Sequence, residues 1–171
     1  MTFRYAGVLH VFIIGKTTNQ KIAMPKQVIV QHYAYSRAQF DWAKSSKGWV
    51  GLFTDDRDKD VCLDCPLSGM GGKCYTHKPM QASGFLSSLR SLPDWSDILP
   101  YDENYHVKEL VRHSNNRFVR FGTYGEPALL PLEVVEGICS VAKKWTAYTH
   151  QWRKFPIFKQ WFMASTESLE L

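Results

Sequence analysis

Three cysteines and one histidine lie close together in the sequence: Cys62, Cys65, Cys74 and His77, with the spacing C-x2-C-x8-C-x2-H. Two thiolates two residues apart can bind one ion from a single turn, and a glycine-rich return can bring a third thiolate back to it. The glycines of that return are Gly69, Gly71 and Gly72. The spacing therefore predicts a metal-binding loop at about 61–78.

The same residues fit two kinds of metal. All four ligands together would close a tetrahedral zinc site. The three cysteines alone resemble an iron–sulfur ligand set that keeps one position open for a fourth residue or a substrate. A disulfide between two of the cysteines, or three buried thiols without metal, are the structural alternatives. The fourth cysteine, Cys139, lies in an apolar helical pattern and is expected to be a core residue.

The second half of the chain predicts a β-α-β unit. Apolar and polar residues alternate over Arg117–Phe121, as in a strand. Pro131, which suits the first position of a helix, is followed by an apolar stripe at helical spacing that extends to Trp145. Strands are then expected at Thr146–His150 and Trp161–Ala164. Such a unit implies parallel strands.

Each of these three strands is followed by, or ends in, polar residues, at 123–126, 149–151 and 165–167. Ligands bind at the carboxyl ends of parallel strands, so these groups are expected to share one rim. Glu126 and His150 are the candidates for acid–base chemistry there. The alternatives are a carboxylate at a helix start for Glu126 and a hydrogen-bonded strand end for His150.

The first half is less regular. Runs of β-branched residues predict strands at Val8–Ile14, Gln27–Tyr33 and Trp49–Thr54, the first two separated by a polar turn at 17–21. Helices are expected at Tyr35–Lys44 and Gln81–Leu92. A charged loop is expected at Asp55–Asp60.

The length of 171 residues fits a single α/β domain, 1–171. No leader-like or membrane-spanning segment is recognised in the sequence, so we expect a cytoplasmic protein without membrane contact. The net charge of +5 and the many aromatic residues permit nucleic-acid binding. The candidate contacts are Arg112, Arg117, Lys143, Lys144, Arg153 and Lys154.

The segment Gly122-Thr123-Tyr124-Gly125-Glu126 followed by Pro, after a strand and before a helix, resembles the Gly-Gly-Glu-Pro segment of radical S-adenosylmethionine enzymes. That resemblance implies that the segment borders the amino group of S-adenosylmethionine. The span from Val61 to Glu167 also resembles an uncharacterised phage-borne family with a C-x2-C…C-Tyr cluster, which implies the host cytoplasm as its location. The fold expected is a partial, incomplete barrel or an open parallel sheet with β-α-β units.

The cysteine spacing departs from the C-x3-C-x2-C of radical S-adenosylmethionine enzymes, and the chain is too short for a complete eight-unit barrel. Two functions follow. The first is a metal-containing, phage-type enzyme similar to radical S-adenosylmethionine enzymes, with a small-molecule ligand and an iron–sulfur cluster or zinc. The second is a zinc-stabilised module that binds nucleic acid or a host protein.

Overall fold

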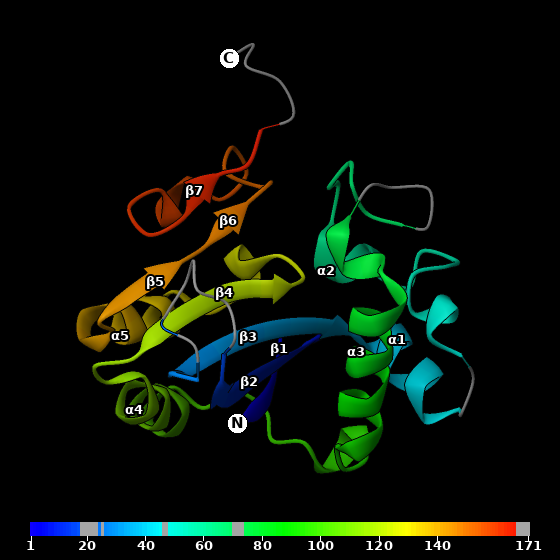
Figure 1. The fold of residues 1–171 in the computed structure, drawn as a ribbon, viewed down its shortest axis with the longest axis horizontal. Coiled ribbons are helices and arrows are strands. Elements are labelled where there is room, and N and C mark those ends of the chain that lie inside the picture. The colour runs from blue at the N-terminus through cyan, green and yellow to red at the C-terminus, as the bar shows by residue number, and fades with distance from the viewer. Residues whose placement is uncertain (18–23, 25, 46–47, 70–73, 167–171) are drawn as a thin grey trace.

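A mixed five-stranded sheet runs through the centre of the molecule in strand order β1-β2-β3-β4-β5 (Figure 1). The computed structural model describes residues 1–171 except 18–23, 25, 46–47, 70–73 and 167–171. The five strands are β1 (Thr2–Tyr5), β2 (Val8–Lys16), β3 (Val28–Ser36), β4 (Phe118–Tyr124) and β5 (Lys144–Thr146). Neighbours are antiparallel from β1 to β3 and parallel from β3 to β5. The expected α/β class is confirmed, but the sheet is mixed rather than parallel, and the described strands close no barrel.

The β-α-β unit is present as β4, α5 (Leu132–Val141) and β5, and the two strands pair in parallel as predicted. The helix ends earlier than its apolar stripe indicated. Ala142 turns into extended backbone, and the N–H of Lys143 donates to the carbonyl of Arg117 at 2.9 Å. Trp145, expected on the helix, therefore lies in β5.

The strand expected over Thr146–His150 is divided. Its first residue ends β5, and β6 (Tyr148–Thr149) leaves the main sheet to pair in parallel with β7 (Met163–Ala164). Only the last two residues of the strand expected at Trp161–Ala164 are extended, because Trp161 still belongs to the turn that follows the 3₁₀ helix Pro156–Phe158.

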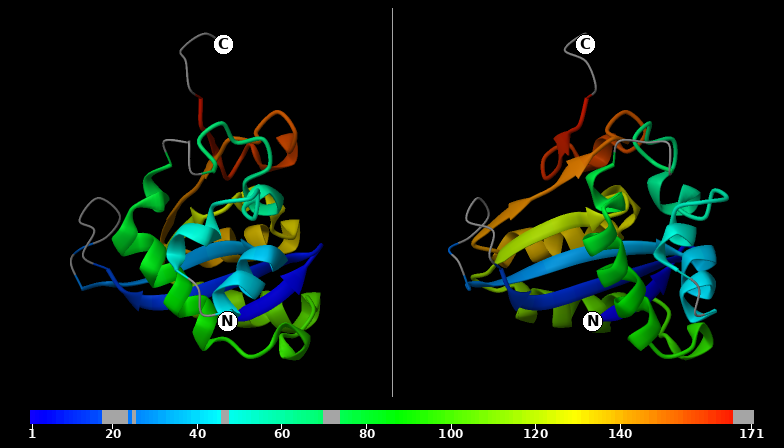
Figure 2. Two further views of the ribbon diagram at one scale, coloured as in Figure 1. Left: turned by 90° about the vertical axis from the view of Figure 1, so that its right-hand side faces the viewer. Right: turned by 45° about the vertical axis from the view of Figure 1, so that its right-hand side comes forward.

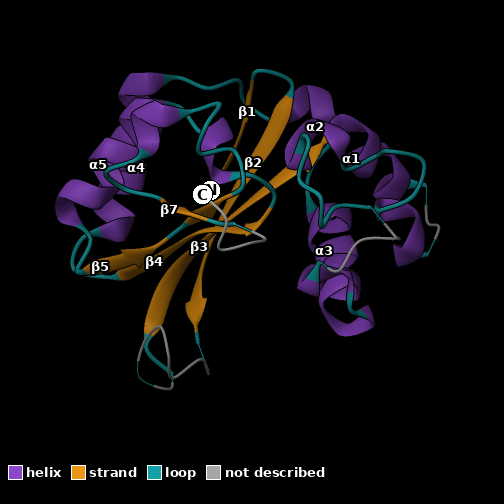
Figure 3. Ribbon diagram, turned by 90° about the horizontal axis from the view of Figure 1, so that it is seen from above, coloured by secondary structure: helices purple, strands orange, loops and turns teal. Residues whose placement is uncertain are grey.

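Helices cover both faces of the sheet (Figure 3). Besides α5, the α-helices of the described residues are α1 (Arg37–Lys44), α2 (Lys59–Cys62), α3 (Pro79–Ser91) and α4 (Glu103–Ser114). One apolar core lies under α1 and α3, and a second lies under α4 and α5. Cys139 packs against the second core, as expected.

The hairpin of the first half forms as predicted, with β2 and β3 paired from Val8 opposite Ser36 to Lys16 opposite Val28. Most of its polar turn, 18–21, lies outside the described residues. Helix α1 begins with a capping box in which Ser36 and Gln39 each accept the other's backbone N–H at 3.1 Å.

The prediction of a strand at Trp49–Thr54 is wrong, because Trp49–Leu52 forms a 3₁₀ helix instead. This segment folds back on α1. A Cβ on Gly51 would lie 1.9 Å from the Trp42 ring, so glycine allows a close approach that no other residue would. The run is apolar because it joins the core, not because it pairs in the sheet.

Helix α4 was not expected from the sequence; it begins at the N-cap Asp102, whose side chain accepts the N–H of Tyr105 at 2.8 Å. Among the described residues, no helix is long and apolar enough to cross a membrane.

Two segments far apart in sequence meet at one end of the molecule. The segment around α2 and the pair β6–β7 both lie at the end shown uppermost in both views of Figure 2. The carboxyl end of β4 leads toward this end, and the backbone N–H of Glu126 donates to the carbonyl of Val61 in α2 at 2.7 Å. The cysteine segment is thereby attached to the turn that follows β4.

Candidate functional site

One cavity of about 340 Å³ gathers most of the residues singled out in the sequence. Its walls include the candidate ligands Cys62, Cys65 and Cys74 and the candidate acid–base residues Glu126 and His150. All five residues of the turn Gly122–Glu126 line the cavity, and so does Ser165. The polar ends of β4, β6 and β7 therefore share one rim with the cysteine segment, and we define this space as the cysteine cavity.

Two glycines shape the turn that forms one wall of the cysteine cavity. Gly122 and Gly125 have φ of +61° and +76°, a conformation that residues with a Cβ rarely adopt. A Cβ on Gly125 would lie 2.8 Å from the Cβ of Ala34 in β3. Glycine at 125 thus lets the turn pack directly on the neighbouring strand.

Glu126 is 5% exposed, and both of its carboxylate oxygens accept backbone hydrogen bonds. The N–H of Ala128 donates to Oε1 at 3.0 Å, and the N–H of His150 donates to Oε2 at 3.3 Å. Burial raises the pKa of Glu126, and hydrogen bonds from Thr149 and from these N–H groups oppose that rise. The carboxylate caps the 3₁₀ helix Pro127–Leu129 and fixes the end of β6, so the helix-start alternative describes part of its role.

Cys62 and Cys65 are held in one tight turn, because the N–H of Cys65 donates to the carbonyl of Cys62 at 3.0 Å. Burial is the main cause that raises the pKa of the Cys62 thiol, and the neighbouring Asp58, Cys65 and Cys74 raise it further. Burial also raises the pKa of Cys65. A cation between these sulfurs would reverse this effect, since a bound metal favours the thiolate.

Cys74 approaches from the other side of the loop, where its Sγ lies 2.9 Å from Oγ1 of Thr76. All four cysteines are free thiols in the structure, and none of them forms the disulfide of the alternative interpretation. Within the described ranges, no group of three or more His, Cys, Asp or Glu side chains is arranged to hold a metal ion. The chemistry of the three sulfurs fits a soft metal, but a metal would have to draw them closer together. Two glycines of the expected return, Gly71 and Gly72, lie outside the described residues.

His77, the fourth expected ligand, is bonded to Cys74 through the backbone, where its N–H donates to the Cys74 carbonyl at 3.2 Å. His77 does not line the cysteine cavity; its ring lies 4.1 Å from that of Phe53, centroid to centroid. Its Nε2 is 4.0 Å from Oδ2 of Asp58, a carboxylate that also accepts the N–H of Gly69 at 3.1 Å. Burial lowers the pKa of His77, and the charge of Asp58 opposes this. Both ring nitrogens of His77 are buried without a hydrogen-bond partner in the described part of the chain, so a metal-ligand role and a packing role both fit this residue.

Several residues of the cavity were not found by the sequence reasoning. Arg120 and Tyr75 line it, and Nη2 of Arg120 donates to the Tyr75 hydroxyl at 2.8 Å. Arg120 lies in the alternating strand that the sequence predicted, so its position in that strand could have indicated which face of the sheet its side chain is on. Tyr75 carries no such signal, because the 3₁₀ helix Tyr75–His77 has no period to read.

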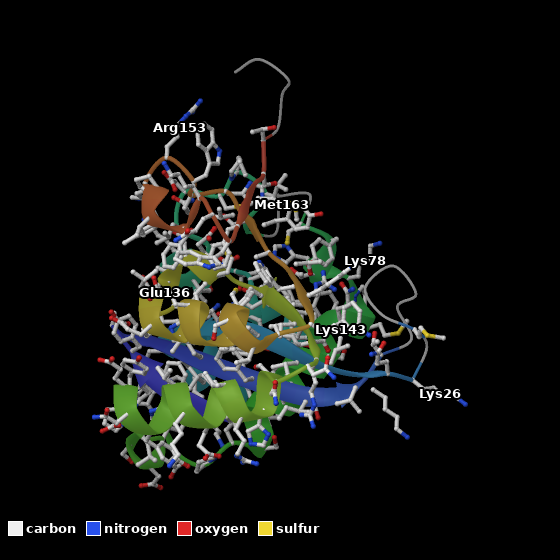
Figure 4. All side chains as sticks on the ribbon, turned by 90° about the vertical axis from the view of Figure 1, so that its left-hand side faces the viewer. Lys26, Lys78, Glu136, Lys143, Arg153 and Met163 are labelled. Atoms are coloured by element: carbon white, nitrogen blue, oxygen red, sulfur yellow. The ribbon has the colours of Figure 1, made fainter. Side chains whose placement is uncertain are left out.

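The basic residues proposed for nucleic-acid contact do not form one surface. Arg112 lies on α4, where it pairs with Glu109 at 2.7 Å, whereas Arg153 lies beyond β6 at the opposite end of the molecule (Figure 4). Arg117 donates to the carbonyl of His113 at 2.9 Å. Lys143 lies over the ring of Phe118. Lys144 is in β5, and Lys154 lines a different hollow from the cysteine cavity.

Compared with known proteins, the chain matches no protein-family model, and no curated protein or solved structure is significantly similar to it. The residues of the cysteine cavity are therefore the only basis for a function.

Proposed function

We propose that this protein is a metal-containing enzyme in which Cys62, Cys65 and Cys74 hold an iron–sulfur cluster next to a ligand-binding cavity. Three cysteine ligands leave one position of a cluster open. The observation that carries the proposal is that all three thiols line the same cavity as the turn Gly122–Glu126 and His150. An open position there would face a small molecule rather than bulk solvent.

S-adenosylmethionine is the ligand that the Gly122–Glu126 segment suggests by its resemblance to radical S-adenosylmethionine enzymes. The turn offers a rigid wall, because Glu126 is fixed by two backbone N–H groups and by its own N–H bond to Val61. The His150 side chain is the cavity's candidate acid–base group. A phage-borne enzyme would act in the host cytoplasm.

A zinc-stabilised module that binds nucleic acid or a host protein is the competing proposal, and it needs His77 as the fourth ligand. The absence of His77 from the lining of the cysteine cavity weighs against it, although both ring nitrogens of His77 are buried without a hydrogen-bond partner in the described part of the chain. The spread of the basic residues over α4, β5 and the end of β6 weighs in the same direction.

The experiment is to purify the full chain without oxygen, to measure its iron, sulfide, zinc and visible absorption, and then to titrate S-adenosylmethionine. We expect iron and sulfide in equal amounts and a visible spectrum that changes as S-adenosylmethionine binds. The matched variant is His150→Gln, whose backbone N–H still bonds Glu126; it should keep the cluster and alter the response to the ligand. Zinc without visible absorption, lost on His77→Ala, would replace the enzyme by the binding module.

A further inference from the structure

A second hollow of about 330 Å³ lies beside the cysteine cavity, between α3 and the sheet. Its floor comes from β2 and β3, with Ile13, Gln31 and Tyr33, and its side wall comes from α3, with Met80 and Phe85. Ile13 and Met80 are 38% and 87% exposed, so the hollow presents apolar surface to solvent. We call this space the α3 groove.

The α3 groove and the cysteine cavity share one wall. Tyr75, Thr76, Arg120 and Thr123 line both spaces. The shared wall joins two hollows of similar size, so a ligand longer than either one can extend across it. Arg120 stands at the junction.

The Arg120 guanidinium has no carboxylate partner among the described residues, although it lines both hollows. It is held in place all the same. The Tyr75 hydroxyl accepts from its Nη2 at 2.8 Å and donates to the carbonyl of Thr123 at 3.3 Å. An arginine oriented by a neutral partner keeps its charge and most of its N–H donors for an anion.

A further donor lies in the same wall. The Thr123 hydroxyl is buried, and its best partner in the described part of the chain is the Tyr33 phenol, whose pKa a weak hydrogen bond with Thr123 lowers but which lies outside normal hydrogen-bond geometry. A buried hydroxyl without a partner is costly unless a ligand or water completes it. Arg120 and Thr123 together could therefore bind one anionic group.

The charge around the α3 groove suits an anion. None of the described residues that line the groove is Asp or Glu. Phe118 lies two residues before Arg120 on β4, so the two side chains are on the same face of the sheet. The ammonium group of Lys143 lies over the ring of Phe118. Among the described residues that line the groove, Arg120 is the only charged one.

We propose that Arg120 and Thr123 bind the phosphate or carboxylate of a small molecule whose apolar or aromatic body occupies the α3 groove. Ring edges from Tyr33 and Phe85, whose centroids are 5.8 Å apart, and the thioether of Met80 suit an aromatic body. This site goes beyond the proposed function and requires no metal.

The test is calorimetric titration of the full chain, as purified, with phenyl phosphate, benzoate, inorganic phosphate and benzyl alcohol as probes. We expect phenyl phosphate to bind, inorganic phosphate to compete with it, and benzyl alcohol to bind much more weakly. The comparison of phenyl phosphate with benzoate distinguishes a phosphate ligand from a carboxylate ligand. The same titrations on the Cys74→Ser protein make the result independent of the cluster.

Arg120→Gln should weaken phenyl phosphate binding by about ten-fold or more, the expected loss for a charge-assisted hydrogen-bond donor. Tyr75→Phe keeps the ring and removes the hydroxyl that orients Arg120, and it should weaken binding by a smaller factor. Arg112→Gln, on α4, is the matched control and should bind like wild type. Absence of binding of both phenyl phosphate and benzoate to the wild type, or equal binding of the bound probe by a folded Arg120→Gln protein, would overturn the proposal.

Discussion

The backbone N–H of His150 donates to Oε2 of Glu126 at 3.3 Å and so ties the end of β6 to the turn that follows β4. Because the N–H of Glu126 also bonds the carbonyl of Val61, one buried residue connects three segments around the cysteine cavity. The cavity therefore depends on Glu126 for its shape, whatever chemistry the carboxylate adds.

Glu126→Gln should lower the free energy of unfolding by about 1–3 kcal/mol, the cost of leaving a buried hydrogen-bonding group unsatisfied. The amide has one oxygen to accept with, and its NH₂ would face a second backbone donor. Urea unfolding measures the effect. Glu136→Gln, at an exposed position of α5, is the control and should change stability by less than about 0.5 kcal/mol. Equal stability of the two variants would contradict this role of Glu126.

Gly125→Ala should destabilise the protein by about 1 kcal/mol or more, because its φ is positive and its Cβ would press on Ala34. Gly84→Ala is the matched change at a glycine in α3 with open space around its Cβ position. It should stabilise the helix by about 0.5–1 kcal/mol. Thermal unfolding of the two variants should shift in opposite directions; a shift of Gly125→Ala to higher temperature would refute the close approach of the turn to β3.

His77→Ala should leave the metal content unchanged and lower stability by about 1–3 kcal/mol, since the packing of a partly buried ring against Phe53 is lost. Metal per chain and the midpoint of urea unfolding are measured on the same preparation. Loss of one metal ion per chain would instead identify His77 as a ligand and favour the closed zinc site.

A buried histidine pair makes stability depend on pH. Nδ1 of His10 lies 3.1 Å from Nε2 of His32, and Nδ1 of His32 accepts the N–H of Gly122 at 3.3 Å. His32 must therefore carry its proton on Nε2 and donate it to His10. Burial lowers the pKa of His10 to about 3, and burial together with His10 lowers that of His32 well below its ordinary value.

The unfolded chain protonates histidine near pH 6.5, so between about pH 6.5 and pH 3 it binds more protons than the folded chain. Stability should therefore fall as the pH decreases through this window, by at most about 1.4 kcal/mol per pH unit for each histidine. Unfolding by urea at about pH 7.5 and about pH 5 measures the loss. The double variant His10→Phe, His32→Phe should lose less stability over the same interval; an identical loss would assign the pH dependence to other groups.

The sequence predicted the elements whose signal is local. Strands β2 and β3 are apolar β-branched runs, and α3 and α5 carry apolar residues at helical spacing. The position of β5 was missed because Lys144 and Trp145 continue the helical stripe, and only the pairing of β5 with β4 decides their conformation. The residues 49–52 were missed because the packing of Gly51 on Trp42 is a tertiary contact.

The same distinction applies to the cavity. Cysteine spacing and polar strand ends pointed to most of its residues, because ligand types and strand ends can be recognised without coordinates. Arg120 was not recognised as part of it, since its role depends on Tyr75, which reaches it through the tertiary fold. The packing of the His77 ring against Phe53 could not be predicted either, because Phe53 reaches it through the tertiary fold.

The most direct measurement of the central claim is the iron, sulfide and zinc content per chain of protein purified without oxygen, for the wild type and for Ser variants of each cysteine. We expect each of Cys62→Ser, Cys65→Ser and Cys74→Ser to lose iron, sulfide and visible absorption. Cys139→Ser, which changes a cysteine packed against the second core, should keep them. Full metal content in Cys62→Ser, Cys65→Ser and Cys74→Ser, or a wild type without any metal, would contradict a metal site in the cysteine cavity.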